Sequence, residues 1–331
     1  SVSILDAPAG GAEGTPIPLS IGVIEPGSAD DAAGIQTAWE VTKNGALFAS
    51  GSGTALLFTP DDQGAYVVTV TATDKDGGTS TTSAAINVTN VEPTAVLGAP
   101  ETVSEGASFT LTMTAPADPS SIDSTAGFTY AFDCGAGAGF GPFGAASATC
   151  ATADNGTRAV AAKVRDKDGG VTTYTGTVTV TNLAPVSSIT SVVSSTPPSI
   201  VPGVALLLAG TFDDLGTADS HQITWNFGDG GTGTSTVAAG ASHALATSHA
   251  YANPGTYAIT LTVTDDDGAT VSSGASVVVQ TPAAAALTLV NTISSLATLS
   301  TNEKKGLVQK LEAAASLTGG NAACAQHKNF V

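Results

Sequence analysis

Positively charged residues are scarce in this sequence. Its 331 residues include 10 Lys and Arg against 28 Asp and Glu, which gives a net charge of −18 at pH 7. A nucleic-acid-binding protein needs a basic face for the phosphates, and an anionic membrane surface attracts basic segments, so both partner classes are disfavoured. The excess of carboxylates instead suits solubility or the binding of hard cations through oxygen ligands.

Long hydrophobic runs are absent as well. No stretch of about 18 apolar residues occurs, so the sequence predicts no membrane span. The first residues, SVSILDAPAGG, lack the basic start and apolar centre of a signal peptide, as a mature or excised fragment would. The last residues, AQHKNFV, stop within a helix-like pattern, and we therefore expect this chain to be part of a longer protein.

Few residues are of the kinds that perform catalysis. The histidines are His221, His243, His249 and His327, and neither a third His nor a Cys accompanies His243 and His249 at a spacing typical of a transition-metal site. The Gly-rich stretch FGDGGTGT lacks the Lys and the following helix of a phosphate-binding loop. We therefore expect a non-catalytic protein.

Cysteine is limited to three residues. Cys134 and Cys150 flank the Gly-rich segment CGAGAGFGPFGAASATC, and no C-x-x-C spacing suggests a metal site. The spacing favours a disulfide between these two residues, which indicates an oxidising, extracellular setting; the alternative is two buried thiols. Cys324 is left over, either free or paired outside this chain.

Three acidic turns of the form D-x-D-G recur along the chain. They begin at Asp74, Asp166 and Asp265, which lie 92 and 99 residues apart, and an alternating strand precedes and follows each turn. A strand, a tight turn with Gly in its last position and another strand make a β-hairpin. The spacing matches a β-sandwich domain rather than a solenoid repeat.

The repeat predicts an all-β protein of three tandem immunoglobulin-like sandwiches. The segments TNVEPTA (89–95) and TNLAPVS (181–187) are short linkers. Trp39 and Trp225 take the strand position where a sandwich buries its core aromatic residue, which favours a core role over a ligand platform. We expect the domains at residues 1–90, 91–183 with the Cys134–Cys150 loop, and 184–281, followed by a helical tail at 282–331.

The third repeat resembles a known family. WNFGDGG followed by HAYANPGTYAITLTVTDDDG is similar to the polycystic kidney disease (PKD) repeat, with its W-x-F-G-D-G turn, H-x-Y-x-x-P-G-x-Y segment and V-x-D-x-x-G hairpin. The first repeat keeps Trp39 and the hairpin but has EVTKNG in place of the F-G-D-G turn, and the second inserts the disulfide loop. The resemblance implies extracellular, non-catalytic spacer and interaction modules of cell-surface proteins and secreted bacterial enzymes.

The last 50 residues change in character. Residues 283–299 carry apolar residues at helical spacing, and 300–320 begin with Ser300 and Glu303 at capping-box spacing and end at Gly319-Gly320. The segment NAACAQHKNFV could begin a third helix. Together these patterns predict a small helical segment that needs a partner surface for stability.

Acidic residues gather in two loops of every repeat. In an immunoglobulin-like sandwich, the loop between the second and third strands lies at the same end as the last hairpin. Clustered carboxylates repel each other unless a cation neutralises them, and Ca²⁺ accepts six to eight oxygen ligands. The alternative is that D-x-D-G merely forms a good turn. The predicted calcium ligands are Asp213, Asp219, Asp265 and Asp267 in the third repeat, Asp118, Asp123, Asp166 and Asp168 in the second, and Glu25, Asp30 (or Asp31), Asp74 and Asp76 in the first.

A cation at this end could stiffen the linker to the preceding domain, with Glu92 as a further ligand at the first linker. The sequence thus predicts a structural or adhesive protein of an extracellular surface, whose partners are copies of itself or a cell-surface protein or glycan. Residues 1–21 could donate a strand to a neighbour or form the first strand of their own domain. Alternatives are an accessory spacer of a secreted hydrolase or a phage or virus decoration protein. The sequons at Asn87 and Asn155 permit N-glycosylation.

Overall fold

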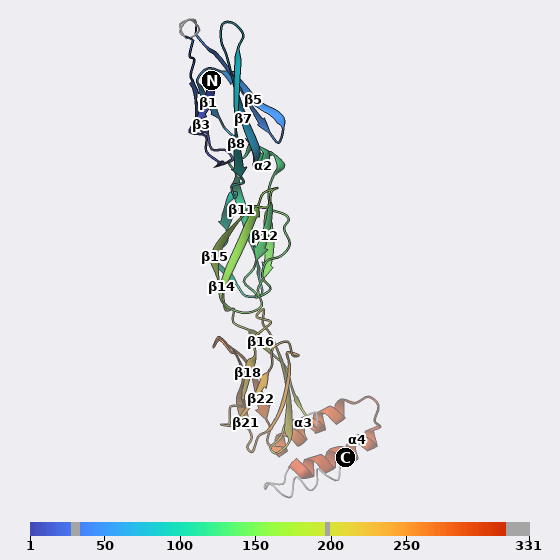
Figure 1. Cartoon of the computed structure of the whole chain (residues 1–331). Coiled ribbons are helices and arrows are strands. Elements are labelled where there is room, and N and C mark those ends of the chain that lie inside the picture. Colours follow the sequence, from blue (N-terminus) through green and yellow to red (C-terminus); the bar gives the residue numbers. More distant parts are fainter. Residues whose placement is uncertain (28–33, 196–198, 316–331) are drawn as a thin grey trace. The chain divides into compact units, whose positions relative to one another are not determined.

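The computed structural model describes residues 1–27, 34–195 and 199–315. In this described part of the chain, six β-sheets make up three immunoglobulin-like sandwiches, and a pair of helices follows them (Figure 1). The chain divides into two compact units. The first unit comprises residues 1–103, 108–150 and 157–179, and the second comprises 104–107, 151–156 and 180–331.

The first sandwich pairs a three-stranded sheet, β1-β3-β6, with a five-stranded sheet, β2-β8-β7-β4-β5. Its strands are β1 (Val2–Leu5), β2 (Gly10–Ala12), β3 (Ile17–Val23), β4 (Gln36–Lys43), β5 (Ala46–Ser52), β6 (Ala55–Phe58), β7 (Gly64–Thr73) and β8 (Thr79–Thr89). Strand β1 pairs antiparallel with β3, so the N-terminal segment is a strand of its own domain. Alternation along β7 buries Tyr66, Val68 and Val70 in the core.

The second sandwich is built from the sheets β13-β11-β9 and β10-β15-β14-β12. Its elements are β9 (Thr94–Gly98), β10 (Thr102–Ser104), β11 (Ser108–Ala117), α2 (Ser121–Ala126), β12 (Thr129–Asp133), β13 (Ser147–Ala151), β14 (Gly156–Arg165) and β15 (Val171–Thr181). A disulfide joins Cys134 to Cys150 with the Cα atoms 5.5 Å apart, as predicted. Because Cys134 follows β12 and Cys150 lies on β13, this bond links the two sheets.

The third sandwich contains the sheets β16-β17-β20 and β19-β18-β21-β22. Its strands are β16 (Val186–Ser194), β17 (Ala205–Asp213), β18 (His221–Asn226), β19 (Thr232–Val237), β20 (Ala244–Ala250), β21 (Gly255–Asp265) and β22 (Thr270–Val279). Trp225 is buried in the core beside Ile259 and Leu261, as expected. Its counterpart Trp39 is only partly buried and packs against the core of the first sandwich.

Two helices follow the third sandwich, α3 (Pro282–Ser295) and α4 (Thr301–Ala315). The Oγ1 of Thr281 caps α3 by accepting from the backbone N–H of Ala284 at 3.2 Å. Ser300 and Glu303 form the predicted capping box, in which Glu303 Oε2 accepts from the Ser300 backbone N–H at 2.8 Å. Within the described residues, neither helix is long and apolar enough to cross a membrane. The predicted helix end at Gly319-Gly320 and the predicted third helix lie outside the described residues.

Candidate metal centres

The first aspartate of each D-x-D-G turn holds the turn together. Asp74 Oδ1 accepts from the backbone N–H groups of Asp76 and Gly78, at 2.9 and 2.7 Å. Asp166 makes the same pair of hydrogen bonds, and Asp265 Oδ1 accepts from Ala269. The glycine that follows has a φ of 85° at 77, 94° at 169 and 93° at 268, which an L side chain rarely adopts. The Oδ1 atom of each first aspartate therefore stabilises its own turn, as the turn-forming alternative predicts.

The second oxygen of the turn aspartate binds the linker in two of the three repeats. Asn90 Nδ2 donates to Asp166 Oδ2 at 2.9 Å, and Asn182 Nδ2 donates to Asp265 Oδ2 at 3.1 Å. The amide oxygens of both asparagines are buried and accept no hydrogen bond from any residue that the structure describes. Each linker thus contributes a buried oxygen without a donor.

Two glutamates that the sequence analysis did not select hold the linkers from the other side. Glu13 Oε1 accepts from the backbone N–H of Val91 at 2.8 Å, and Glu105 Oε1 accepts from that of Leu183 at 2.6 Å. Both glutamates are fully buried, and the Oε2 atom of each accepts no hydrogen bond within the described part of the chain. A buried carboxylate oxygen without a donor is costly, so each of these two oxygens is a candidate ligand for a cation.

The glycine after each glutamate lets the two loops meet closely. Gly14 has a φ of 66°, and a Cβ at this position would lie 2.4 Å from the Cβ of Pro119. Gly106 has a φ of 70°, and a Cβ there would lie 2.5 Å from the Cβ of Leu215. These contacts bring each Glu-Gly turn against the loop that follows β11 or β17.

The carboxylates around the linkers form two groups. Within each, sets of three ligand atoms lie within 4.8 Å of one another. The first acid cluster consists of Glu13, Asp62, Asp118, Asp123 and Asp168. The second acid cluster consists of Glu105, Asp154, Asp214, Asp219, Asp265, Asp266 and Asp267. All residues of the first cluster belong to the first compact unit, and all residues of the second belong to the second.

The second acid cluster contains a buried carboxylate that accepts no hydrogen bond from the described residues. Asp219 is 3% exposed, and neither of its carboxylate oxygens accepts a hydrogen bond from the described residues. Burial raises its pKa to about 7, with further increases from the negative charges of Glu105 and Asp214. Burial also raises the pKa of Glu105. A cation placed among these oxygens would remove both causes.

The first acid cluster has the same character. Burial raises the pKa of Glu13, and the carboxylates of Asp123 and Asp118 raise it further. Burial also raises the pKa of Asp118 and Asp123. Asp118 Oδ2 is buried without a hydrogen bond from the described residues. The cluster therefore presents carboxylate oxygens that suit a hard divalent cation.

The two clusters are copies of one arrangement. Three residues recur at an offset of 92. Glu13 corresponds to Glu105, and the linker residue Asn90 corresponds to Asn182. Asp62, in the loop before β7, corresponds to Asp154, in the loop before β14. The aspartates of the following sandwich are also equivalent, namely Asp118 and Asp214, Asp123 and Asp219, and Asp168 and Asp267.

One residue of the predicted ligand set, Asp213, lies outside the second acid cluster. Asp213 ends strand β17 on its outward face, where its side chain is 99% exposed. The residue that follows the strand, Asp214, joins the cluster instead. Asp214 Oδ2 lies 2.9 Å from Nε2 of buried His221. The predicted residues Asp219, Asp265 and Asp267 do come together, as do Asp118, Asp123 and Asp168. Asp166 instead binds Asn90 and its own turn.

At the acidic end of the first sandwich, none of the predicted ligands among the described residues belongs to a cluster of carboxylates. Glu25 and Asp74 line one depression, but Glu25 Oε1 accepts from the backbone N–H of Gly27, and Asp76 is exposed beside Lys75. Asp30 lies outside the described residues. Glu92 is exposed and belongs to neither acid cluster, so the structure does not support it as a ligand.

Among the described residues, the far end of the third sandwich lacks this arrangement. Pro202 precedes Gly203 where the earlier sandwiches have Glu13-Gly14 and Glu105-Gly106, and Asn253 takes the place of Asp62 and Asp154. A Cβ at Gly203 would meet no atom within 4 Å. The strand after the last hairpin leads here into helix α3 rather than into another sandwich.

Other candidate features serve packing. His249 Nε2 lies 2.8 Å from Asp229 Oδ2, and its ring stacks on Phe227 at 4.1 Å.

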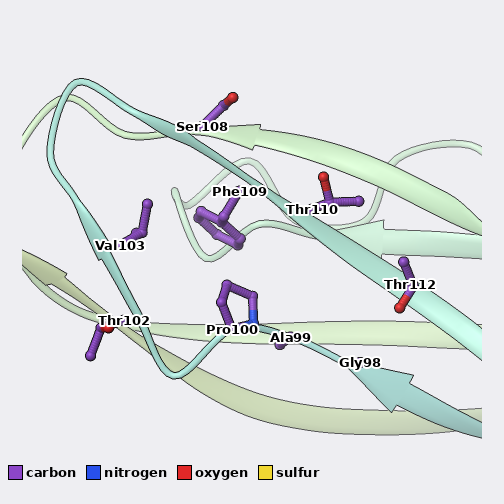
Figure 2. A pocket seen from close by; sticks show the side chains of 9 residues that line it. All are labelled: Gly98, Ala99, Pro100, Thr102, Val103, Ser108, Phe109, Thr110 and Thr112. Carbon is purple, nitrogen blue, oxygen red and sulfur yellow. The ribbon is translucent and has the colours of Figure 1, made fainter.

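A shallow groove lies between the segment after β9 and strand β11, where Figure 2 shows Pro100 and Phe109 among its lining residues. None of its lining side chains is titratable, so it offers no acid–base pair. Asn87 is exposed on β8 and Asn155 is half-buried, and their glycosylation stays a prediction.

Comparisons with known proteins match part of the chain to a family and find similar solved structures. Residues 190–280 match the PKD domain family. The PKD1 domain of Vibrio anguillarum Epp is 24% identical, with a TM-score of 0.23, and the match covers 31% of this chain and 100% of that one. A tetra-tandem repeat from the extending region of a large adhesion protein is 17% identical, with a TM-score of 0.38 and coverage of 84% and 74%. No curated protein matches the chain.

A structure described for host cell surface retention of a 1.5-MDa bacterial ice-binding adhesin is 15% identical, with a TM-score of 0.28 and coverage of 81% of this chain and 91% of that one. PKD domains and related repeats are typically non-catalytic modules. Residues 190–280 thus match a PKD domain, and the described residues form three tandem immunoglobulin-like sandwiches.

Proposed function

We propose that the chain is a non-catalytic structural and adhesive region of an extracellular surface protein, in which calcium ions at the two linkers stiffen the array. The observation that carries the proposal is the repeated acid cluster, with buried and unpartnered oxygens contributed by the segments before and after each linker. Such an arrangement gives a bound cation ligands from both sides, so that binding would resist bending of the linker.

Calcium is the cation that these ligands favour. The candidate ligands at the second linker are all oxygens, from Glu105, Asp214, Asp219 and the amide of Asn182. Ca²⁺ takes six to eight oxygens in a flexible geometry, whereas Mg²⁺ demands an octahedron and keeps several waters. Loops that provide many carboxylates from several segments suit the larger and less demanding ion.

Two features of the proposal support an extracellular location. The Cys134–Cys150 disulfide persists in oxidising compartments, and calcium at millimolar concentration is characteristic of the extracellular medium. Contact with other copies, or with a cell-surface protein or glycan, would use the exposed edges of the sheets. Strand β16 is such an edge, on which Val186 is 70% exposed.

Limited proteolysis of the full chain tests the stiffening role. We expect cleavage within 89–95 or 181–187 to accelerate when a chelator replaces calcium, and magnesium to protect less well than calcium at equal concentration. Identical cleavage with calcium and with chelator would contradict the proposal. Electron microscopy of the native material tests the assembly role, because fibres or layers support self-association and isolated particles contradict it.

A further inference from the structure

A lysine already lies within the first acid cluster. Lys167 Nζ is 3.0 Å from both carboxylate oxygens of Asp62 and 3.2 Å from Asp123 Oδ1, and it also pairs with Asp168. The Asp62 loop belongs to the first sandwich, whereas Asp123 and Asp168 belong to the second. One ammonium group therefore joins carboxylates from both sides of the linker.

The charges of the first cluster adjust to this lysine. Burial alone would raise the pKa of Asp62, but the hydrogen bond from Lys167 and the charge of Lys43 outweigh it and lower the pKa. Burial alone would lower the pKa of Lys167, but hydrogen bonds to Asp168, Asp62 and Asp123 raise it. Lys167 therefore lies as a counter-ion among the carboxylates of this cluster.

The second acid cluster has a negative charge at the equivalent position. The second hairpin reads Asp166-Lys167-Asp168-Gly169, and the third reads Asp265-Asp266-Asp267-Gly268. Asp266 has a ligand atom within 4.8 Å of those of Asp219 and Asp267. The exchange of Lys for Asp changes the local charge by two units, in a cluster whose central carboxylate is buried without a hydrogen-bond donor among the described residues.

This difference sets how each linker behaves without a divalent cation. In the first cluster, Lys167 offsets part of the repulsion between carboxylates and contacts both sides directly. In the second cluster, Asp266 adds to the repulsion, because like charges at a few ångströms disfavour the compact arrangement. A lysine is a compact point charge that neutralises a carboxylate group without the six to eight ligands that calcium requires.

We propose that the two linkers differ in their dependence on calcium: Lys167 keeps the first linker (89–95) closed without a divalent cation, whereas the second linker (181–187) is a calcium-dependent hinge. This inference rests on the proposed calcium role of the acid clusters and assigns it unequally. The first and second sandwiches then stay joined when calcium is low, and the third sandwich gains freedom.

Hydrogen–deuterium exchange of the full chain tests the inference without any substitution. With calcium, amide exchange in both linkers is slow. After chelation, we expect exchange to accelerate by about tenfold or more in residues 181–187 and by less than about twofold in residues 89–95. Equal acceleration in both linkers, or greater acceleration in the first, overturns the inference.

Reciprocal charge substitutions provide the second test. Asp266→Lys supplies the missing counter-ion, so residues 181–187 should stay protected in chelator. Lys167→Asp removes it, so residues 89–95 should become calcium-dependent. The matched control is Lys75→Asp, which makes the same change at the same turn position of the first hairpin, away from both linkers. Circular dichroism spectra and melting curves with calcium verify that each variant is folded.

The outcomes separate this inference from the proposed function. If neither linker responds to chelation and titration calorimetry detects no calcium binding, both fail. If both linkers respond equally and neither reciprocal variant changes its linker, the calcium role stands and the inference fails. Selective opening of the second linker, reversed by Asp266→Lys, supports both.

Discussion

Glu105 accepts a hydrogen bond from the backbone N–H of Leu183 at 2.6 Å, while its other carboxylate oxygen is buried and accepts none from the described residues. One oxygen thus fixes the linker, and the other is a candidate ligand for the proposed cation. Glu13 and Val91 repeat this relationship 92 residues earlier, so both linkers share the same arrangement.

Glu105→Gln should weaken calcium binding at the second acid cluster. The substitution keeps an oxygen that can accept from Leu183, but it removes one negative charge from the ligand set. We expect at least about a tenfold loss of affinity, or about 1.4 kcal/mol, by titration calorimetry. Glu101→Gln is the control, because Glu101 is exposed. Unchanged affinity in Glu105→Gln would rule out this glutamate as a ligand.

Gly106→Ala should loosen the second linker. The new Cβ would lie 2.5 Å from the Leu215 Cβ and 2.7 Å from its carbonyl oxygen, at a φ of 70°. Gly203→Ala is the matched control, because Gly203 has a φ of 79° but would meet no atom within 4 Å. The backbone cost, about 1 kcal/mol, is common to both, and only Gly106→Ala adds a steric cost of about 1–3 kcal/mol. Proteolysis at 181–187 should accelerate only in Gly106→Ala, and equal behaviour of the two variants would contradict the close contact.

In the absence of calcium, the third sandwich should lose stability as the pH rises. The pKa of Asp219 is about 7 in the folded chain against an ordinary 3.8, so folding favours its protonated form. The resulting stabilisation is complete below about pH 3.8 and disappears as the pH passes about 7. Urea unfolding of Trp39→Phe in chelator, monitored by Trp225 fluorescence, should show this decline between these pH values.

Asp219→Asn is the control for that experiment, because an amide does not titrate and should flatten the profile. Calcium should reverse the slope in the unsubstituted protein, since the cation binds the deprotonated carboxylate. If the urea concentration at the unfolding midpoint in chelator increases from pH 4 to pH 7, Asp219 is not the group that dominates the pH dependence of stability.

Loss of the Cys134–Cys150 bond should destabilise the second sandwich selectively. The bond closes a loop of 16 residues between two sheets, which corresponds to about 3 kcal/mol of unfolding free energy. The double variant Cys134→Ser/Cys150→Ser should unfold the second sandwich at a lower temperature in calorimetry. The transition of the third sandwich should stay within about 2 °C, and a shift of both transitions together would show that the sandwiches unfold as one unit.

The sequence could predict the sandwiches because their signals are local. Alternation in strands such as Gly64–Thr73 and the Gly at position 77, 169 or 268 determine hairpins without reference to distant residues. The disulfide followed from the spacing of Cys134 and Cys150 in the same way. It was harder to predict whether Asp213 or Asp214 would face the second acid cluster, because a shift of one residue decides which side chain turns inward.

The acid clusters were only half predictable. Asp118, Asp123, Asp219 and Asp267 lie in loops that the immunoglobulin topology places at one end of their own sandwich. Glu13 and Glu105 come from the opposite end of the preceding sandwich, and only the packing of each linker brings them in. Their signal was nevertheless present, since AEG and SEG recur at the 92-residue spacing of the linkers.

The most direct measurement is the anomalous diffraction of crystals grown with calcium. We expect a calcium peak within about 2.3–2.6 Å of oxygens from Glu105 and Asp219, in the midst of the second acid cluster. A map with no peak there at millimolar calcium, and with the two carboxyl groups hydrogen-bonded to each other instead, would contradict the proposal that cations hold these repeats together.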